Sequence, residues 1–195
     1  MNPRSFFKRI LTRYYQRMRI LLYKGLSTNK NIVGKPLIQQ PVLFAGEGKM
    51  IFEDQVYLGY FPSPHFYDSS IYIEARGKDS VIKIGQNSFI NNGAKIVCDR
   101  TMIQMGSNLL IGLNFEVQDS DFHGLHPDKR RGSDYSCDPV IIEDNVFIGN
   151  NVRIMKGVTI GKNSVIANSS VVVSNIPADS VAGGNPAKVI KSVYA

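Results

Sequence analysis

Residues 142–172 read IEDNVFIGNNVRIMKGVTIGKNSVIANSSVV, and an aliphatic residue returns at every sixth position of this stretch. A period of six is an even multiple of the two-residue strand repeat but no multiple of 3.6, so neither an α-helix nor an ordinary amphipathic strand explains it. The pattern indicates a repeat architecture. The repeating residues are Ile142, Ile148, Ile154, Ile160, Ile166 and Val172, and a small residue follows four positions later at Val146, Val152, Val158, Ser164 and Ser170.

Six-residue repeats predict a triangular coil of parallel strands. Each hexad supplies one short, flat strand and the turn after it, so three hexads make one coil of about 18 residues. The aliphatic residue of each hexad then points inward and stacks on its equivalents in the neighbouring coils. Asparagine is suited to tight corners, and we expect the corner positions to include Asn145, Asn150, Asn151, Asn163 and Asn168.

The end of the chain carries a second signal. Residues 182–191 read AGGNPAKVIK and follow Ile176 and Pro177. With the hexads, this ending resembles the hexapeptide-repeat family of acyltransferases, in particular its sugar and antibiotic O-acetyltransferases. The resemblance implies an all-β fold, a left-handed parallel β-helix with a short C-terminal cap, and a homotrimer with its sites between subunits. The handedness rests on the resemblance alone, because crossovers between parallel strands are generally right-handed.

Composition limits the class of protein. The 195 residues are one domain's length, and no stretch approaches the ~20 apolar residues of a membrane span. Cys98 and Cys137 have neither metal-binding nor redox spacing, which fits a reducing compartment. We therefore expect a cytoplasmic protein.

The net charge of +7 belongs to one end of the chain. Eight of the 23 basic residues precede position 31, whereas the first acidic residue is Glu47. The rest of the chain has 15 basic and 16 acidic residues, so we expect no binding of nucleic acid. We divide the chain into a basic amphipathic helix within residues 1–30, a β-helix over residues 31–175 and a C-terminal segment over residues 176–195.

Residues 5–24 have the apolar spacing of an α-helix, and Gly25 marks its end. Two interpretations remain open. In the first, the helix packs on the open end of the coil stack or on a neighbouring subunit, since repeat proteins need caps. In the second, it binds peripherally at the inner face of the membrane, attracted by anionic lipid. The apolar stripe consists of Phe7, Ile10, Leu11, Tyr14, Met18, Leu21 and Leu22.

The largest interruption of the repeat, at about residues 118–139, predicts the active-site loop, because long loops in compact domains are usually functional or disordered. Acyl transfer from a thioester to a hydroxyl needs a base, and histidine is suited to that near neutral pH. Residues 119–123 read DSDFH, which matches the segment that holds the catalytic histidine in the resembling acetyltransferases. We therefore predict His123 as the base.

Three neighbours of His123 leave alternatives open. His126 is the rival histidine, and it either binds the acceptor or is simply exposed. Asp119 or Asp121 either orients the imidazole, as a carboxylate does in a triad, or caps a turn. We include Asp121 in the catalytic set.

The resemblance also implies the remaining contacts. It places Asn91 against the acceptor, although an asparagine in a corner is an equal alternative. Acetyl-CoA is expected along the groove between subunits. Apart from the resemblance, lysines are suited to this site because their cations can bind the phosphates of the cofactor. Phe147 stands where many relatives have tryptophan. The predicted donor-binding residues are Asn150, Asn168, Val173, Ser174, Lys188 and Lys191.

Together these features predict an acetyl-CoA-dependent O-acetyltransferase that modifies a sugar hydroxyl of a bacterial cell-surface polysaccharide or its precursor. No Gly-x-Ser-x-Gly elbow is present, which favours direct attack by the acceptor. An N-acetyltransferase of an amino sugar and a non-catalytic β-helix scaffold are the alternatives. We expect no metal ion, because His123 and His126 lack a third histidine at coil spacing.

Overall fold

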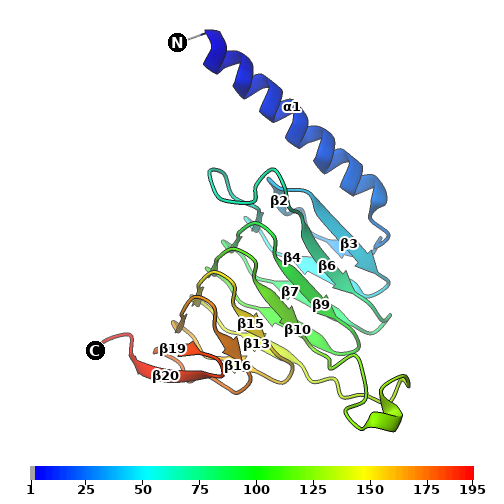
Figure 1. Ribbon diagram of the computed structural model, residues 1–195, viewed down its shortest axis with the longest axis vertical. Coiled ribbons are helices and arrows are strands. Elements are labelled where there is room, and N and C mark those ends of the chain that lie inside the picture. The colour runs from blue at the N-terminus through cyan, green and yellow to red at the C-terminus, as the bar shows by residue number, and fades with distance from the viewer. Residues whose placement is uncertain (1–2) are drawn as a thin grey trace.

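A computed structural model describes the backbone of residues 3–195 and the side chains of residues 10–195. In this part of the chain the helix α1 (Pro3–Leu26) precedes a stack of triangular coils, which forms a left-handed parallel β-helix. Figure 1 shows α1 at one end of the stack and the C-terminus near the other. The predicted fold class is therefore confirmed.

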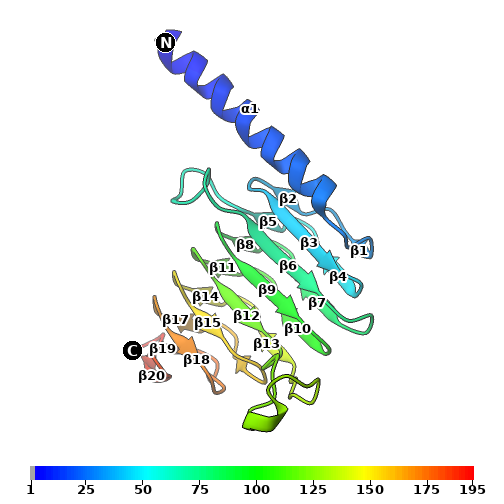
Figure 2. The same ribbon diagram turned by 45° about the vertical axis from the view of Figure 1, so that its right-hand side comes forward.

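Three sheets form the faces of the stack within residues 3–195, and Figure 2 shows strands running side by side down one face. The first sheet consists of β1 (Ile32–Val33), β4 (Lys49–Phe52), β7 (Val81–Ile84), β10 (Met102–Met105), β13 (Val140–Ile142) and β16 (Thr159–Ile160). The second consists of β2 (Leu37–Ile38), β5 (Tyr57–Leu58), β8 (Phe89–Ile90), β11 (Leu110–Ile111), β14 (Phe147–Ile148), β17 (Val165–Ile166), β19 (Ser180–Gly184) and β20 (Ala187–Ser192). The third consists of β3 (Val42–Gly46), β6 (Ile71–Ala75), β9 (Lys95–Cys98), β12 (Glu116–Gln118), β15 (Arg153–Ile154) and β18 (Val171–Val172).

The repeating aliphatic positions form the core, as the six-residue period predicts. All six positions from Ile142 to Val172 are at most 1% exposed. Ser164 and Ser170 occupy the position of the small residue and are fully buried. Each hydroxyl donates a hydrogen bond to a backbone carbonyl, at 2.8 Å and 2.7 Å. Because these hydroxyls are paired, the two serines fit in the interior.

Asparagine side chains serve the corners in two ways. Asn145, Asn151 and Asn163 have left-handed backbone, with φ of 58°, 58° and 63°, and so make the predicted tight corners. Asn150 and Asn168 instead cap the coil before their own. The Asn168 Oδ1 accepts a hydrogen bond from the Asn150 N–H at 2.7 Å, and the Asn150 Oδ1 accepts one from the preceding coil at 2.8 Å. These side chains satisfy backbone N–H groups at the corners.

Two loops leave the stack, both at corners. Residues 59–70 connect β5 to β6, and residues 119–139 connect β12 to β13 and include the short 3₁₀ helix Pro127–Lys129. The buried Asn92 holds the first loop, since its Nδ2 donates to the carbonyls of Tyr60 at 3.1 Å and Pro64 at 2.9 Å. An insertion at a corner leaves the stacked core intact.

A buried carboxylate, Asp119, closes the corner at which β9 passes to β10. Its Oδ1 accepts a hydrogen bond from the Asp99 N–H at 2.6 Å. Its Oδ2 accepts from the N–H groups of Arg100 and Thr101 at 3.1 Å and 2.8 Å and from the Thr101 hydroxyl at 2.9 Å. Because Asp119 is fully buried, these bonds replace water. Residues 99–101, which separate β9 from β10 and interrupt the six-residue repeat, are therefore held by a side chain from the next coil.

The two ends of the chain leave the coil pattern differently. β19 pairs in parallel with β17, whereas β20 pairs antiparallel with β19, so the predicted C-terminal cap is a hairpin at the edge of the second sheet.

At the other end α1 stops at Leu26, one residue past Gly25. The side chain of Phe7, part of the predicted apolar stripe, lies outside the described side chains. Among residues 3–195, no helix combines the length and the apolar character needed to cross a bilayer.

We expect the Asp119→Ala variant to lose about 3 kcal/mol or more of its free energy of unfolding, because three backbone N–H groups and a hydroxyl lose their charged acceptor. Asp54→Ala removes an exposed carboxylate at another corner and should change this free energy by less than about 0.5 kcal/mol. Urea unfolding followed by circular dichroism measures both. Equal stability of the two variants would contradict the role of Asp119.

Candidate active site

The base of the 119–139 loop is a short antiparallel pairing. Ser120 and Cys137 form a β-bridge across it. The Asp121 N–H donates to the Ser136 carbonyl at 3.1 Å, and the Asp138 N–H donates to the Asp119 carbonyl at 2.8 Å. These bonds make the loop a hairpin-like arm anchored to the stack, rather than an unstructured insertion.

His123 lies on this arm with its ring orientation set by one hydrogen bond. Its Nδ1 is 2.9 Å from the backbone carbonyl oxygen of Arg130. A carbonyl oxygen can only accept, so Nδ1 carries the hydrogen and donates it. In the neutral imidazole the other nitrogen, Nε2, is then unprotonated and able to accept a proton. The arm therefore presents His123 in the tautomer that a general base requires.

The backbone on either side of His123 has unusual geometry. Phe122 has φ of 59°, a left-handed conformation that is uncommon for a bulky residue and recurs at functional sites. Gly124 lies so close to the other side of the arm that a Cβ atom there would stand 2.7 Å from the carbonyl oxygen of Lys129. These constraints hold the turn on which His123 is carried.

The carboxylates near His123 in sequence have other partners. The Asp121 carboxylate is 3.6 Å from Lys156 Nζ, and Asp119 caps the buried corner described above. The Arg130 carbonyl is the observed partner of the His123 ring, and of the two roles left open for the carboxylates Asp119 takes that of a cap. His126 caps the 3₁₀ helix, and its Nδ1 accepts from the Asp128 N–H at 3.3 Å. Among the described residues, no group of three or more His, Cys, Asp or Glu side chains could hold a metal ion.

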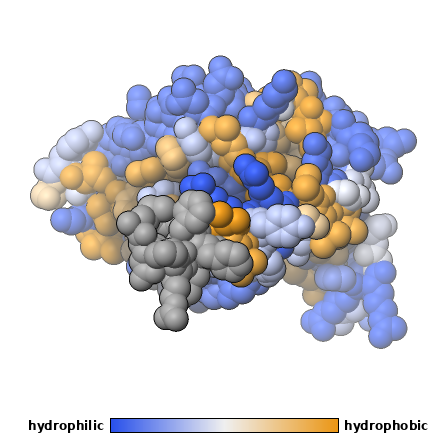
Figure 3. Space-filling model, turned by 90° about the horizontal axis from the view of Figure 1, so that it is seen from above, coloured by the Kyte–Doolittle hydropathy of each residue, from blue (hydrophilic) through white to orange (hydrophobic). Residues whose placement is uncertain are grey.

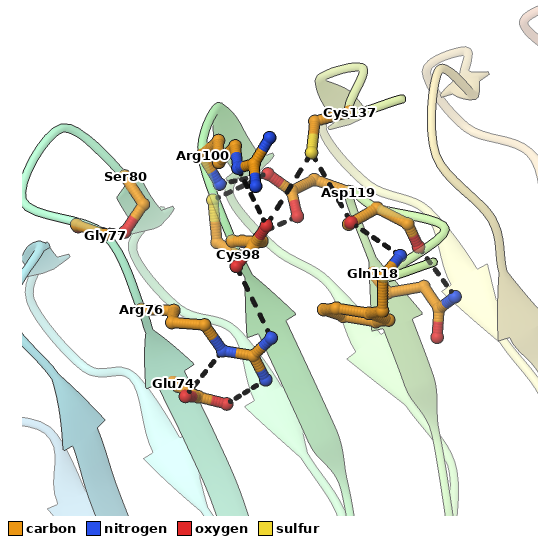
Figure 4. Close-up of polar contacts among 12 residues, drawn as sticks. Glu74, Arg76, Gly77, Ser80, Cys98, Arg100, Gln118, Asp119 and Cys137 are labelled. Carbon is orange, nitrogen blue, oxygen red and sulfur yellow. Dashed lines mark hydrogen bonds and ion pairs between the residues drawn. The ribbon is translucent and has the colours of Figure 1, made fainter. Parts of the chain in front are cut away.

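A cluster of charged residues from the preceding coils lies beneath the arm. We call Arg76, Asp99 and Arg100 the corner cluster. Asp99 is 3% exposed, and its carboxylate lies 3.4 Å from Arg76 Nη1 and 3.3 Å from Arg100 Nε. Glu74 holds the other edge of the Arg76 guanidinium, at 2.9 Å and 3.0 Å. Figure 4 shows Arg76, Arg100 and Asp119 gathered at the ends of neighbouring strands.

The corner cluster holds both sides of the arm. The Arg76 guanidinium lies over the Phe122 ring, 4.8 Å from its centroid, and the Arg100 guanidinium lies 4.1 Å from the centroid of Tyr135. The Tyr135 hydroxyl donates to Asp99 at 2.9 Å. This hydrogen bond, together with burial, raises the pKa of Tyr135, so the phenol stays protonated and remains a donor. The cluster thus fixes Phe122, which precedes His123, and Tyr135 on the returning segment of the arm.

The two cysteines near this corner stay protonated. Burial, with the nearby Asp119 carboxylate, raises the pKa of the Cys98 thiol to about 12. Burial also raises the pKa of Cys137, although a hydrogen bond with Ser120 opposes the shift. Since the thiolate is the nucleophilic form, neither cysteine is prepared for nucleophilic catalysis.

The predicted catalytic residues His123, Asp121 and Asn91 fall in two separate cavities. His123 and Asp121 line a cavity of about 360 Å³ on the arm. Asn91 lines another of about 310 Å³, together with Phe147 and Asn150, on the outer side of the second sheet. The two cavities share no lining residue, so one chain does not bring Asn91 and His123 together.

The predicted donor residues lie on the later coils. Asn150 and Asn168 stack at one corner, where their side chains cap backbone N–H groups, and their contact with the donor stays a prediction. Val173 and Ser174 are exposed just after β18. Lys188 and Lys191 are exposed on β20. The chain therefore presents two cations at the C-terminal end of the stack.

Reasoning from the sequence missed the corner cluster and the Arg130 carbonyl. The interruption of the repeat at residues 99–101 is the available signal for Asp99 and Arg100, because insertions in such stacks mark corners with a special role. The Arg130 carbonyl could not be predicted, because every residue has a backbone carbonyl and no sequence pattern distinguishes this one.

Comparison with known proteins agrees with this architecture. The family described as "Bacterial transferase hexapeptide (six repeats)" matches residues 139–174. A solved hexapeptide-repeat acetyltransferase of Vibrio cholerae O1 biovar eltor, in complex with acetyl coenzyme A, is 30% identical with a TM-score of 0.56. The match covers 90% of this chain and 76% of that one.

Two further solved structures are similar. The polysialic acid-specific acetyltransferase NeuO is 28% identical, with a TM-score of 0.62 and coverage of 84% of this chain and 68% of that one. A maltose O-acetyltransferase from Clostridium difficile 630 is 26% identical, with a TM-score of 0.56 and coverage of 95% and 84%. The six-residue core, the extent of the match to the Vibrio protein and the shared fold lead to one conclusion: the chain belongs to the hexapeptide-repeat acyltransferase family.

Proposed function

We propose that this acyltransferase transfers the acetyl group of acetyl-CoA to a sugar hydroxyl of a bacterial cell-surface polysaccharide or its precursor, with His123 as general base. The observation that carries the proposal is the hydrogen bond from His123 Nδ1 to the Arg130 carbonyl, which leaves Nε2 free of its proton. Similarity to an acetyl-CoA-bound acetyltransferase and to two enzymes named for saccharides supports the donor and the class of acceptor.

The chemistry is a direct transfer. The acceptor oxygen attacks the thioester carbonyl carbon while His123 Nε2 takes the hydroxyl proton. The Arg130 carbonyl keeps its hydrogen bond to Nδ1 and stabilises the imidazolium that forms. The tetrahedral intermediate then expels the sulfur of coenzyme A, which receives the proton from the imidazolium, and the acetyl ester is released. No covalent acyl-enzyme forms, which fits the protonated state of both cysteines.

Acetyl-CoA would lie along the later coils. Asn150 and Asn168 offer their corner backbone, Val173 and Ser174 follow at the next corner, and the Lys188 and Lys191 ammonium groups suit the phosphates. In this proposal the donor lies beside the later coils, and its thioester reaches the His123 cavity of one of the two subunits between which it binds.

A neighbouring subunit completes the site in this proposal. The cavity with Asn91 and the cavity with His123 share no lining residue in one chain, and the proposed mechanism uses both residues. Phe89, Leu110 and Phe147 form an exposed apolar column beside Asn91, at 40%, 54% and 50% exposure. We propose that this column packs in a homotrimer, which brings Asn91 of one subunit toward His123 of the next.

Acceptor screening tests the function directly. Acetyl-CoA is incubated with neutral sugars, amino sugars and oligosaccharides, release of coenzyme A thiol is recorded, and NMR of the product locates the acetyl group. An acetyl ester on a sugar oxygen is expected. Acetylation of an amine nitrogen would instead show the N-acetyltransferase alternative, and absence of thiol release with every carbohydrate would refute the proposal.

His123→Ala should lower turnover by about 10² to 10⁴, because it removes the group that accepts the acceptor's proton. The dissociation constant of acetyl-CoA, measured by calorimetry, should stay nearly the same, since the proposed donor contacts lie on other coils. His126→Ala is the matched control and should keep turnover within a few-fold, as its ring caps the 3₁₀ helix. Loss of turnover in His126→Ala with retention in His123→Ala would overturn the assignment.

Tyr135→Phe should lower turnover roughly tenfold, because loss of the hydrogen bond to Asp99 frees the returning segment of the arm around Tyr135 and misplaces His123. The Michaelis constant for acetyl-CoA should not change. Trypsin should cleave the arm faster in the variant than in the wild type. Tyr194→Phe, at an exposed tyrosine near the C-terminus, is the control. A parallel change in the Michaelis constant would point to general unfolding rather than to positioning.

Light scattering should give three times the chain mass of 21.7 kDa. Leu110→Arg should dissociate this assembly and remove turnover together, because it places a charge in the proposed interface. Val33→Arg, at an exposed residue of the first sheet, should keep both. A fully active monomer would contradict the shared site.

A further inference from the structure

The helix α1 turns its apolar side away from the rest of the molecule. Tyr14, Leu21 and Leu22 are 63%, 62% and 60% exposed. With Ile10, Leu11 and Met18 they form the outward stripe, whose members recur at three- and four-residue spacing and so lie along one side of the helix. A helix that only caps its own coil stack would bury this stripe.

The side of α1 that faces the coils carries the partly buried Ile20 and is held by polar contacts. Gln16 is 6% exposed, and its Nε2 donates to the carbonyls of Gln39 at 3.0 Å and Phe66 at 3.2 Å. The Arg19 guanidinium donates to the Ser69 carbonyl at 2.5 Å. Hydrogen bonds to backbone carbonyls therefore fix the rotation of the helix, and this rotation directs the outward stripe away from the stack.

The position of α1 leaves its outward side accessible. Figures 1 and 2 both show the helix projecting obliquely beyond the first coils. Figure 3, seen from this end of the stack, shows hydrophobic surface directly beside strongly hydrophilic surface.

Positive charge accompanies the outward stripe. Arg13, Arg17 and Lys24 are exposed and follow one another at helical spacing along one edge of it. The sequence has no acidic residue before Glu47, so nothing within the helix offsets these cations. A partner that covers this side must offer both an apolar layer and negative charge.

We propose that α1 docks on the surface of an anionic lipid bilayer. The outward stripe enters the boundary between headgroups and acyl chains, where tyrosine is favoured, and Arg13, Arg17 and Lys24 meet the lipid phosphates. A second copy of the helix fits less well, because pairing two outward stripes would bring together basic edges without any acidic residue. Docking would hold the acyltransferase at a membrane surface, whichever acceptor it uses.

The test is sedimentation of the full chain with vesicles of phosphatidylcholine alone or with phosphatidylglycerol. Binding is expected to the anionic vesicles and should weaken with added salt. The double variants Met18→Gln/Leu21→Gln and Arg13→Gln/Arg17→Gln should each lower the partition coefficient about tenfold or more. All four side chains are exposed or lie at the stripe's edge, so the coil stack keeps its fold.

Two matched controls separate docking from general effects. Val33→Gln/Tyr194→Gln removes an exposed apolar pair outside α1, and Lys78→Gln/Lys162→Gln removes the same charge from the coils. Both should bind as the wild type does. Unchanged vesicle binding in the two helix variants overturns the proposal, as does an equal loss in the controls. A smaller mass of Met18→Gln/Leu21→Gln in light scattering would show that a second copy covers the stripe instead.

Discussion

The stacking of one inward aliphatic side chain on its equivalents in adjacent coils is the constraint on which the molecule depends. The repeating positions from Ile142 to Val172 are almost fully buried, and the strands between the two edges of each sheet pair with the strands on either side. An extra residue inside a strand would shift each following side chain to the other face. Function is therefore confined to corners, where added chain leaves the register unchanged.

Both insertions use a buried polar side chain as an anchor. Asn92 binds carbonyls of the 59–70 loop, and that loop in turn supplies the carbonyls that hold Gln16 and Arg19 of α1. Asp119 closes the corner at residues 99–101, which positions the corner cluster under the arm. The corner at Asn92 thus helps to orient α1, and the corner at Asp119 helps to position the arm that carries His123.

Charge is divided in the same way as structure. At the base of the arm, cations of the coils are paired with carboxylates: Arg76 with Glu74 and Asp99, and Lys156 with Asp138 and Asp121. These pairs serve local order at the loop bases. The exposed basic residues of α1 have no acidic neighbour in sequence, so the net charge of +7 acts mainly at one end of the molecule. A single chain therefore combines a nearly neutral scaffold with a strongly basic extension.

The core and its interruptions could be predicted from the sequence, because the period of six is a local pattern that assigns each residue an inward, outward or corner position. The family resemblance supported the prediction of His123 as the base. The contacts around His123 could be predicted neither from the repeat nor from the resemblance. Which group orients the imidazole, that Asp119 is a cap, and that Asn91 lies apart from His123 depend on contacts between residues far apart in sequence. The apolar stripe of α1 was visible in the sequence, but its outward direction was decided by Gln16 and Arg19 bonding to a loop some 50 residues away. Periodicity assigns the faces of an element, whereas only tertiary contacts decide what each face meets.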